Sequence, residues 1–177
     1  MQTLEAIFSR RSIRSFTPDP VSDQELQTII QAAAAAPSAG NAQMWVFIAV
    51  RDTQRIAALR GLAPGIIGRP TTVVILCLDH QRRSDKAEGK QAHMPYYDIG
   101  TALQNMLLAA YDMGLGGCAV GSFHSQGLAA FLSLPETVEP CLLVVLGKPK
   151  VTPRAPRKRP LDEMYFQDKF EAPHANG

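Results

Sequence analysis

The sequence predicts an α/β protein of the α+β kind, a three-layer α-β-α sandwich in which helices flank a central mixed sheet. Apolar runs typical of strands alternate with stretches of helical periodicity, and one run, 71–78, is apolar enough for a strand covered on both faces. The connections are uneven in length, which argues against a regular doubly wound sheet. The 177 residues, 46% hydrophobic and 19% charged, indicate a single domain over 1–177.

The first half of the chain gives clear signals for the ends of its elements. Apolar residues over 4–8 predict a short first helix. Ser22 and Glu25 form the pattern of a capping box, so a second helix begins after Ser22 and continues until Pro37 stops it. The apolar run 45–50 contains β-branched and aromatic residues and predicts a strand.

The second half begins with a third helix that Asp52 caps and Gly61 ends. The strand 71–78 follows, and then a long helix over 97–113 whose apolar stripe requires a large core or a second subunit. The remaining predicted elements are a glycine-rich turn and short strand over 114–121, a helix over 126–132 and a strand over 141–146. Polar residues 79–95 predict a surface loop or lid, and 148–177 an irregular basic tail.

Composition excludes several classes of protein. The net charge of +2 gives no overall attraction to nucleic acid, and no apolar run has the length of a membrane span. The first residues lack the pattern of a secretory signal. Three cysteines, an odd number without close spacing, indicate reduced thiols in a cytoplasmic protein rather than disulfides or a zinc site. No histidine pair has metal spacing, and no nucleophile–base set stands out.

The segment 9–15, Ser-Arg-Arg-Ser-Ile-Arg-Ser, is the most informative stretch of the chain. If it is extended, Arg10, Ser12 and Arg14 project to one side. Guanidinium groups pair two anionic oxygens at once, so these donors suit a phosphate group. Most short basic runs are solvated surface, and that alternative remains open for this segment taken alone.

Two further stretches carry chemistry. Residues 36–45 place the amides of Asn41 and Gln43 among small residues, a surface suited to a flat heteroaromatic ligand, although a simple helix-to-strand connection is the alternative. The run 114–119 matches the dinucleotide fingerprint in letters only, because its glycines end a helix instead of opening one. We therefore expect Gly114 or Gly116 to stop the helix in a left-handed conformation.

Together the motifs Arg-Arg-Ser-x-Arg, Pro-Ser-Ala-Gly-Asn-x-Gln-x-Trp and Gly-Leu-Gly-Gly, in this order, resemble those of the nitroreductase family. The resemblance runs from Leu4 to Phe166 and implies an FMN-dependent oxidoreductase that acts as a homodimer. It also implies that the sandwich is of the nitroreductase type, with its C-terminal tail extending onto the partner subunit.

The resemblance further implies the site. Arg10 and Ser12 would bind the FMN phosphate, joined by a basic pair of the tail, and Arg14 would reach the N1/C2=O side of the flavin. The loop after the second helix would cross to the partner's FMN, and the glycine turn would face the N5/O4 edge. The cofactor-binding residues so implied are Arg10, Arg11, Ser12, Arg14, Pro37, Ser38, Ala39, Asn41, Gln43, Gly116, Gly117, Cys118, Arg157 and Arg159.

Two positions depart from the family pattern. Met44 stands where a proline is usual, and the stretch 61–69 lacks an asparagine that some relatives place against the flavin. His124, just after the glycine turn, is expected to be a surface or capping residue, with a place in the substrate slot as the alternative. No catalytic side chain is predicted, since the cofactor carries the redox chemistry.

The implied reaction takes hydride from NAD(P)H and reduces a nitroaromatic, quinone, enone or free flavin in a ping-pong cycle. Alternatives within flavin chemistry are dehalogenation, dehydrogenation or flavin destruction on the same fold. A catalytically silent flavin-binding module is a third hypothesis. A basic nucleic-acid binder ranks last, because no wide basic surface with interleaved aromatics is evident.

Overall fold

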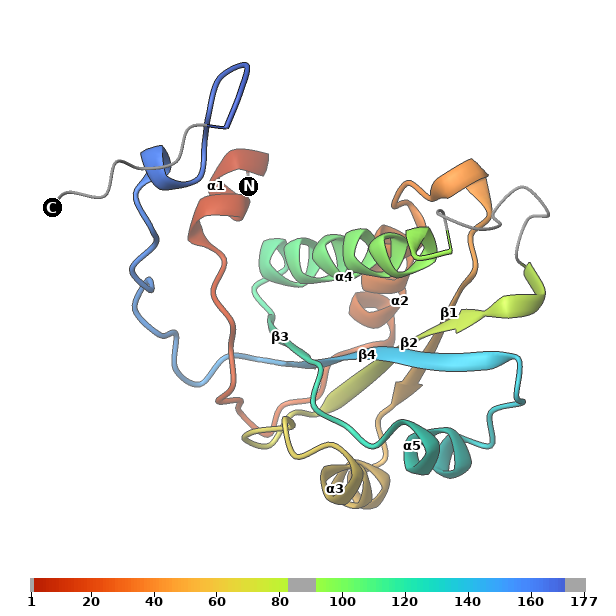
Figure 1. Cartoon of the computed structure of the whole chain (residues 1–177). Helices are drawn as coiled ribbons and strands as arrows, with labels where there is room; N and C mark the ends of the chain where they lie inside the picture. Colours follow the sequence, from red (N-terminus) through yellow and green to blue (C-terminus); the bar gives the residue numbers. More distant parts are fainter. Residues whose placement is uncertain (1, 83–91, 171–177) are drawn as a thin grey trace, which may run out of the picture.

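The computed structural model describes residues 2–82 and 92–170, and it contains the predicted three layers (Figure 1). Its elements are α1 (Thr3–Ser9), α2 (Asp23–Ala34), the 3₁₀ turn η1 (Ala39–Asn41), β1 (Trp45–Val50), α3 (Thr53–Leu62), β2 (Thr72–Asp79), η2 (His80–Arg82), α4 (Met94–Asp112), β3 (Gly116–Val120), α5 (Ser125–Leu132), β4 (Val138–Gly147) and η4 (Leu161–Glu163). Helices α2 and α4 cover one face of the sheet, and α3 and α5 cover the other (Figure 1).

The sheet has the order β1-β2-β4-β3, and all neighbouring strands pair antiparallel. The predicted mixed sheet is thus antiparallel in all its strand pairs, and the parallel pairing of Ser12 with Gly117 is an isolated bridge outside them. Strand β2 is buried along almost its whole length, and its residues alternate between the two helical layers. The apolar run 71–78 is therefore explained by cover on both faces.

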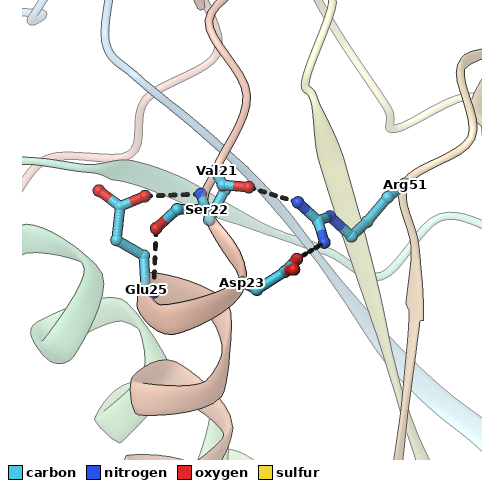
Figure 2. A network of polar contacts seen from close by, with 5 residues as sticks. All are labelled: Val21, Ser22, Asp23, Glu25 and Arg51. Atoms are coloured by element: carbon cyan, nitrogen blue, oxygen red, sulfur yellow. Dashed lines mark hydrogen bonds and ion pairs between the residues drawn. The ribbon is translucent and has the colours of Figure 1, made fainter.

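Helix α2 begins with the predicted capping box (Figure 2). The Ser22 hydroxyl accepts a bond from the Glu25 amide at 3.2 Å, and the Ser22 amide donates to the Glu25 carboxylate at 2.7 Å. Arg51, directly after β1, bonds the Asp23 carboxylate and donates to the Val21 carbonyl at 2.6 Å. The same few residues thus satisfy the helix terminus and tie it to the sheet.

Prolines move two helix boundaries away from the predicted ones. Helix α3 passes through Gly61 and ends at Leu62, because Pro64 disfavours the helical conformation at the residue before it. Helix α4 begins at Met94, three residues earlier than predicted, since Pro95 fits the first turn, where no amide donor is needed.

A bulge lengthens β4 beyond its predicted start at Cys141. Leu76 faces Leu142 and Cys77 faces Pro140, so Cys141 is the extra residue. Proline lacks the amide that a regular ladder needs, and a bulge next to it allows the strand to continue. The strand therefore begins at Val138.

The two predicted irregular segments differ in how much of them is described. Of 79–95, residue 79 ends β2, 80–82 form η2 and 94–95 open α4, whereas 83–91 lie outside the described residues. The tail leaves β4 and runs along the same side of the molecule as α1 (Figure 1). Its residues 151–165 are all exposed and hold one short 3₁₀ turn. Across the described ranges, no helix is both long and apolar enough to cross a membrane.

Candidate functional site

The basic segment 9–15 runs beside the edge strand β3. The Ile13 amide donates to the Gly117 carbonyl at 3.0 Å, and Ser12 pairs with Gly117 in a parallel bridge. This close approach depends on Gly116, because a Cβ atom there would lie 2.6 Å from the Cβ of Ile13. The glycine motif therefore has a structural role: it lets the basic segment lie directly against the sheet.

The start of the C-terminal tail lies against this segment. Phe16 forms an antiparallel bridge with Pro149. The Thr17 amide donates to the Lys148 carbonyl at 2.9 Å, and the Lys150 amide donates to the Ser15 carbonyl at 2.9 Å. The start of the basic tail is thus fixed next to the N-terminal arginines, which concentrates positive charge in one place.

Arg10 has hydrogen-bond donors without acceptors. Its Nε and Nη1 atoms are buried and have no partner in the described structure. Burying unpaired donors of a charged group costs free energy, and native structures rarely leave them so. An anion of two or more oxygens would satisfy the planar fork of the guanidinium. The segment therefore fits the phosphate of FMN.

The other predicted phosphate ligands differ from Arg10. Arg11 Nη1 donates to the carbonyls of Phe8 and Arg10, at 2.8 and 2.9 Å, and so closes the end of α1. Arg11 also lines a small pocket of about 70 Å³ between the basic segment and the start of the tail. Ser12 is half-buried and Arg14 is exposed.

The loop after α2 is held in an unusual conformation. Asn41 and Gln43 have positive φ values of 56° and 47°, and Gly40 has 58°. Ser38 Oγ accepts from the Gln43 amide at 3.1 Å, and Gln43 Nε2 donates to Asn41 Oδ1 at 3.0 Å. A glutamine in the left-handed region is uncommon, and such strain persists where the surroundings impose it, often at functional sites.

Asp98 supports this loop, and sequence reasoning missed it. Its carboxylate accepts a bond from the Ala39 amide at 3.1 Å, and its residue is buried in α4. Thr101 of the same helix bonds the Pro37 carbonyl at 3.4 Å. The position of Asp98 next to Ile99 of the apolar stripe of α4 was the available signal, because a buried carboxylate requires a donor.

The two parts of the predicted site lie at opposite ends of α4. The loop over 37–43 is attached at Asp98, whereas the basic segment lies beside Tyr111, with which Arg11 and Ile13 share a pocket. Tyr111 follows Asp98 by thirteen positions, which is about 20 Å along a helix. Within one chain, these two sets of residues do not form one pocket.

The residues predicted to face the flavin ring, 116–118, lie in strand β3 and not in the turn that ends α4. Gly114 has a φ of 75° and ends α4, which confirms the prediction that Gly114 or Gly116 stops this helix in a left-handed conformation. Gly116, Gly117 and Cys118 belong to β3 and are buried, with Gly117 close to Leu107. In the stretch that follows, Ala119, Gly121 and Ser122 are exposed, so these three residues offer the accessible surface.

Arg157 and Arg159 are exposed on the irregular tail. Their role at the phosphate stays a prediction.

The described histidines have local partners. His124 is the N-cap of α5, where its Nδ1 accepts from the Gly127 amide at 2.9 Å; its predicted capping role is confirmed. His80 bonds the Glu139 carboxylate at 2.8 Å, and the Tyr96 hydroxyl donates to the same oxygen at 2.9 Å. These contacts border a pocket of about 390 Å³. They fasten η2 and α4 to β4 and form no nucleophile–base pair.

The fold of this chain is similar to that of solved oxidoreductases. It matches a hypothetical oxidoreductase of Bacillus subtilis with a TM-score of 0.88 at 28% identity, over 96% of this chain and 74% of the other. It also matches the NADPH:FMN oxidoreductase of Vibrio harveyi, solved with NAD⁺, with a TM-score of 0.86 at 29% identity, over 96% and 78%. These neighbours have the same three-layer fold.

Sequence comparison gives the family. A family model described as Nitroreductase matches residues 7–65 and 57–148. The NADPH-flavin oxidoreductase of Vibrio harveyi is 32% identical over 94% of this chain and 75% of its own length. The oxygen-insensitive NADPH nitroreductase of Salmonella typhimurium is 30% identical over 93% and 75%. The chain belongs to the Nitroreductase family.

Proposed function

We propose that this protein is an FMN-dependent oxidoreductase that works as a homodimer with sites shared between the two subunits. It takes hydride from NAD(P)H and reduces an electrophilic acceptor, namely a nitroaromatic, quinone, enone or flavin, in a ping-pong cycle. The observation that carries the proposal is the buried, unpartnered guanidinium of Arg10 in a segment fixed against β3. The names of the relatives, a flavin oxidoreductase and a nitroreductase, agree with it.

The residues of the basic segment would hold the cofactor and set its charge environment. Arg10 and Ser12 would bind the phosphate, with Arg157 or Arg159 joining them from the tail. When bound, FMN supplies the hydride chemistry, accepting from NAD(P)H and giving to the acceptor. The exposed Arg14 would lie at the ring edge that becomes negative on reduction, where a positive charge favours the reduced form. Exposed Ala119, Gly121 and Ser122 would adjoin the ring.

Two observations support the shared site. The predicted ligands lie at opposite ends of α4, so a two-fold partner is required to bring the loop 37–43 of one chain to the basic segment of the other. In addition, α1 and the tail expose large apolar side chains that a partner subunit would cover. These side chains are Leu4, Ile7, Phe8, Val151, Leu161, Met164 and Tyr165.

A different reaction on the same cofactor is the second candidate. A 5,6-dimethylbenzimidazole synthase of Rhodospirillum rubrum is 28% identical to this chain over 83% of it. The family resemblance therefore extends to a protein named for another reaction, and dehalogenation, dehydrogenation or flavin destruction belong to the same alternative. A silent flavin-binding module would bind FMN and fail to react with NADH or NADPH.

Cofactor analysis and reduction test the proposal directly. We expect yellow protein that releases FMN, not FAD, on acid treatment, and whose absorbance near the visible flavin band bleaches with NADH or NADPH under anaerobic conditions. Adding a quinone or nitroaromatic should restore the band. Protein that binds FMN without bleaching would favour the silent module, and protein that binds no FMN would refute the proposal.

Mixed dimers test the sharing of sites. Arg10→Gln and Asn41→Ala each weaken every site of their own homodimer. If the two residues meet across the interface, a dimer of one Arg10→Gln and one Asn41→Ala chain has one doubly altered site and one intact site. FMN titration should then recover tight binding at half of the sites. If both residues served the same chain's site, no intact site would form and no tight binding would return.

A further inference from the structure

A pocket between α3 and the segment 68–70 has two arginines and no acidic residue in its lining. Its volume is about 240 Å³. The residues that line it are Thr53, Ile56, Ala57, Arg60, Gly68, Arg69 and Pro70. Two positive charges on a shared concave surface repel each other unless an anion lies between them, so the pocket has the charge of an anion site.

Arg60 and Arg69 are available to such an anion. In the described ranges, neither guanidinium has a hydrogen-bond or ion-pair partner. Neighbouring arginines are engaged: Arg55 of the same helix lies 4.8 Å from the centre of the Phe131 ring, and Arg51 bonds Asp23. A ring contact therefore accounts for Arg55 and an ion pair for Arg51, whereas Arg60 and Arg69 have no such local partner in the described ranges.

The rest of the pocket indicates what the anion belongs to. Ile56, Ala57 and Pro70 give it an apolar wall, and Thr53 adds a hydroxyl. Pockets that enclose a whole small-molecule ligand have volumes of about 300–1,000 Å³, so this one accommodates only one end of a larger molecule. That end combines a phosphate with an apolar, ring-like face, which is the chemistry of a phosphorylated nucleoside.

The loop that carries Arg69 is in direct contact with the basic segment. Gly68 has a φ of 78°, and a Cβ atom there would lie 2.1 Å from the Arg14 carbonyl oxygen. Only glycine fits this position, so the pocket and Arg14 keep a fixed relationship. A ligand with one end beside Arg14 can extend along this loop and place its far end between the two arginines.

We propose that this pocket binds the adenosine 2′-phosphate end of NADPH, with Arg60 and Arg69 pairing with the phosphate and the apolar wall contacting the adenine. The inference rests on the proposed function, because it places the nicotinamide end beside the flavin near Arg14. It assigns the protein a preference for NADPH over NADH, since only the former carries the 2′-phosphate.

Calorimetric titration of the full-length holoprotein with adenosine 2′,5′-bisphosphate and with 5′-AMP tests the pocket without any turnover. We expect the bisphosphate to bind at least about tenfold more tightly, a difference typical of charge-assisted bonds to one phosphate. The double variant Arg60→Gln/Arg69→Gln should lose this preference. Arg55→Gln, which removes one positive charge on the opposite side of α3 and leaves Arg60 and Arg69 in place, should keep it.

Steady-state kinetics give an independent readout. The double variant should raise the KM for NADPH about tenfold or more and leave the KM for NADH unchanged. Bisphosphate bound no more tightly than 5′-AMP by the unaltered protein, or a preference that survives the double variant, would overturn the inference. Loss of FMN binding or of turnover would instead count against the proposed function. The calorimetric titration would still show whether the pocket binds the 2′-phosphate.

Discussion

The amide nitrogen of Ile13 lies 3.0 Å from the carbonyl oxygen of Gly117. This bond holds the N-terminal basic segment against edge strand β3, which follows it by more than a hundred residues in the sequence. Everything proposed for the phosphate site depends on this attachment. It requires that Gly116 have no side chain, since Ile13 occupies the space that a Cβ atom would need.

Replacing Gly116 with alanine should detach the basic segment. The new Cβ would lie 2.6 Å from the branched Cβ of Ile13, which cannot rotate away, so we expect a loss of about 1–3 kcal/mol in unfolding free energy and weaker FMN binding. Urea unfolding and FMN titration measure the two effects. Gly61→Ala is the control: it meets no atom within 4 Å on α3 and should stabilise the protein by about 0.5–1 kcal/mol. Equal behaviour of the two variants would contradict the packing described.

Replacing Arg10 with methionine should stabilise the FMN-free protein and weaken its binding of FMN. In FMN-free protein, removal of the unpartnered buried donors should raise the unfolding free energy by about 1–3 kcal/mol, or about 2–4 °C in Tm for each kcal/mol. The stabilisation that added FMN gives should disappear. Arg11→Met, which removes donors bonded to Phe8 and Arg10, should lower the Tm instead. A lower Tm for Arg10→Met with unchanged FMN stabilisation would refute the site.

The capping box of α2 should show in the acid stability of the protein. The amide of Ser22 donates to the Glu25 carboxylate and, with the Ser22 hydroxyl, holds the pKa of that carboxyl below its usual 4.5. A lowered folded pKa stabilises the fold above pH 4.5, and this contribution is lost as the pH falls from 4.5 through the folded pKa. The stability difference between the unaltered protein and Glu25→Ala should therefore stay constant from pH 7 to 5 and shrink below 4.5.

Urea unfolding at pH 7 and pH 3 measures that difference, and Glu136→Ala, an exposed carboxylate outside the box, is the control. Ser22→Ala should cost about 0.5–2 kcal/mol at pH 7. A Glu25→Ala difference that grows on acidification would show that the box has no such role.

The cysteines should be unreactive in the folded protein. Burial raises the pKa of Cys77 to about 12, and burial together with Glu139 raises the pKa of Cys141 to about 12. Both groups are therefore thiols at pH 8; Cys77 and Cys118 are buried, and Cys141 is half-buried. A thiol reagent at pH 8 should react slowly with native protein and with three thiols after denaturation in guanidinium. Rapid reaction of the native protein would show that these strands open.

Local signals in the sequence were sufficient for most elements. The capping box at Ser22 and Glu25 and the strand over 45–50 were predicted as they occur, because each depends on residues within a few positions of one another. The predicted boundaries failed beside Pro64, Pro95 and Pro140. At these positions proline acts on its neighbours' backbone in ways that apolar periodicity does not record.

Contacts between residues far apart in the chain could not be predicted from the sequence. The arginines of segment 9–15 pointed to a phosphate, yet nothing local indicated that this segment pairs with Gly117 or that Arg10 lacks a partner. The support of Ala39 by Asp98 joins residues 59 positions apart. Such contacts arise only when the helices pack on the sheet, and they decide which predicted residues can meet.

The loop over 37–43 is attached near the N-terminal end of helix α4, and the basic segment lies beside its C-terminal end. The length of α4 and the rotation along it therefore determine how these two proposed parts of the site are placed relative to each other. Each residue of an α-helix advances the chain by about 1.5 Å and turns it by about 100°. A single residue inserted between Asp98 and Tyr111 would therefore displace the loop over 37–43 relative to the basic segment, and in the proposed homodimer it would do so in each subunit. Under the proposed arrangement, the length of α4 sets the distance between the two shared sites.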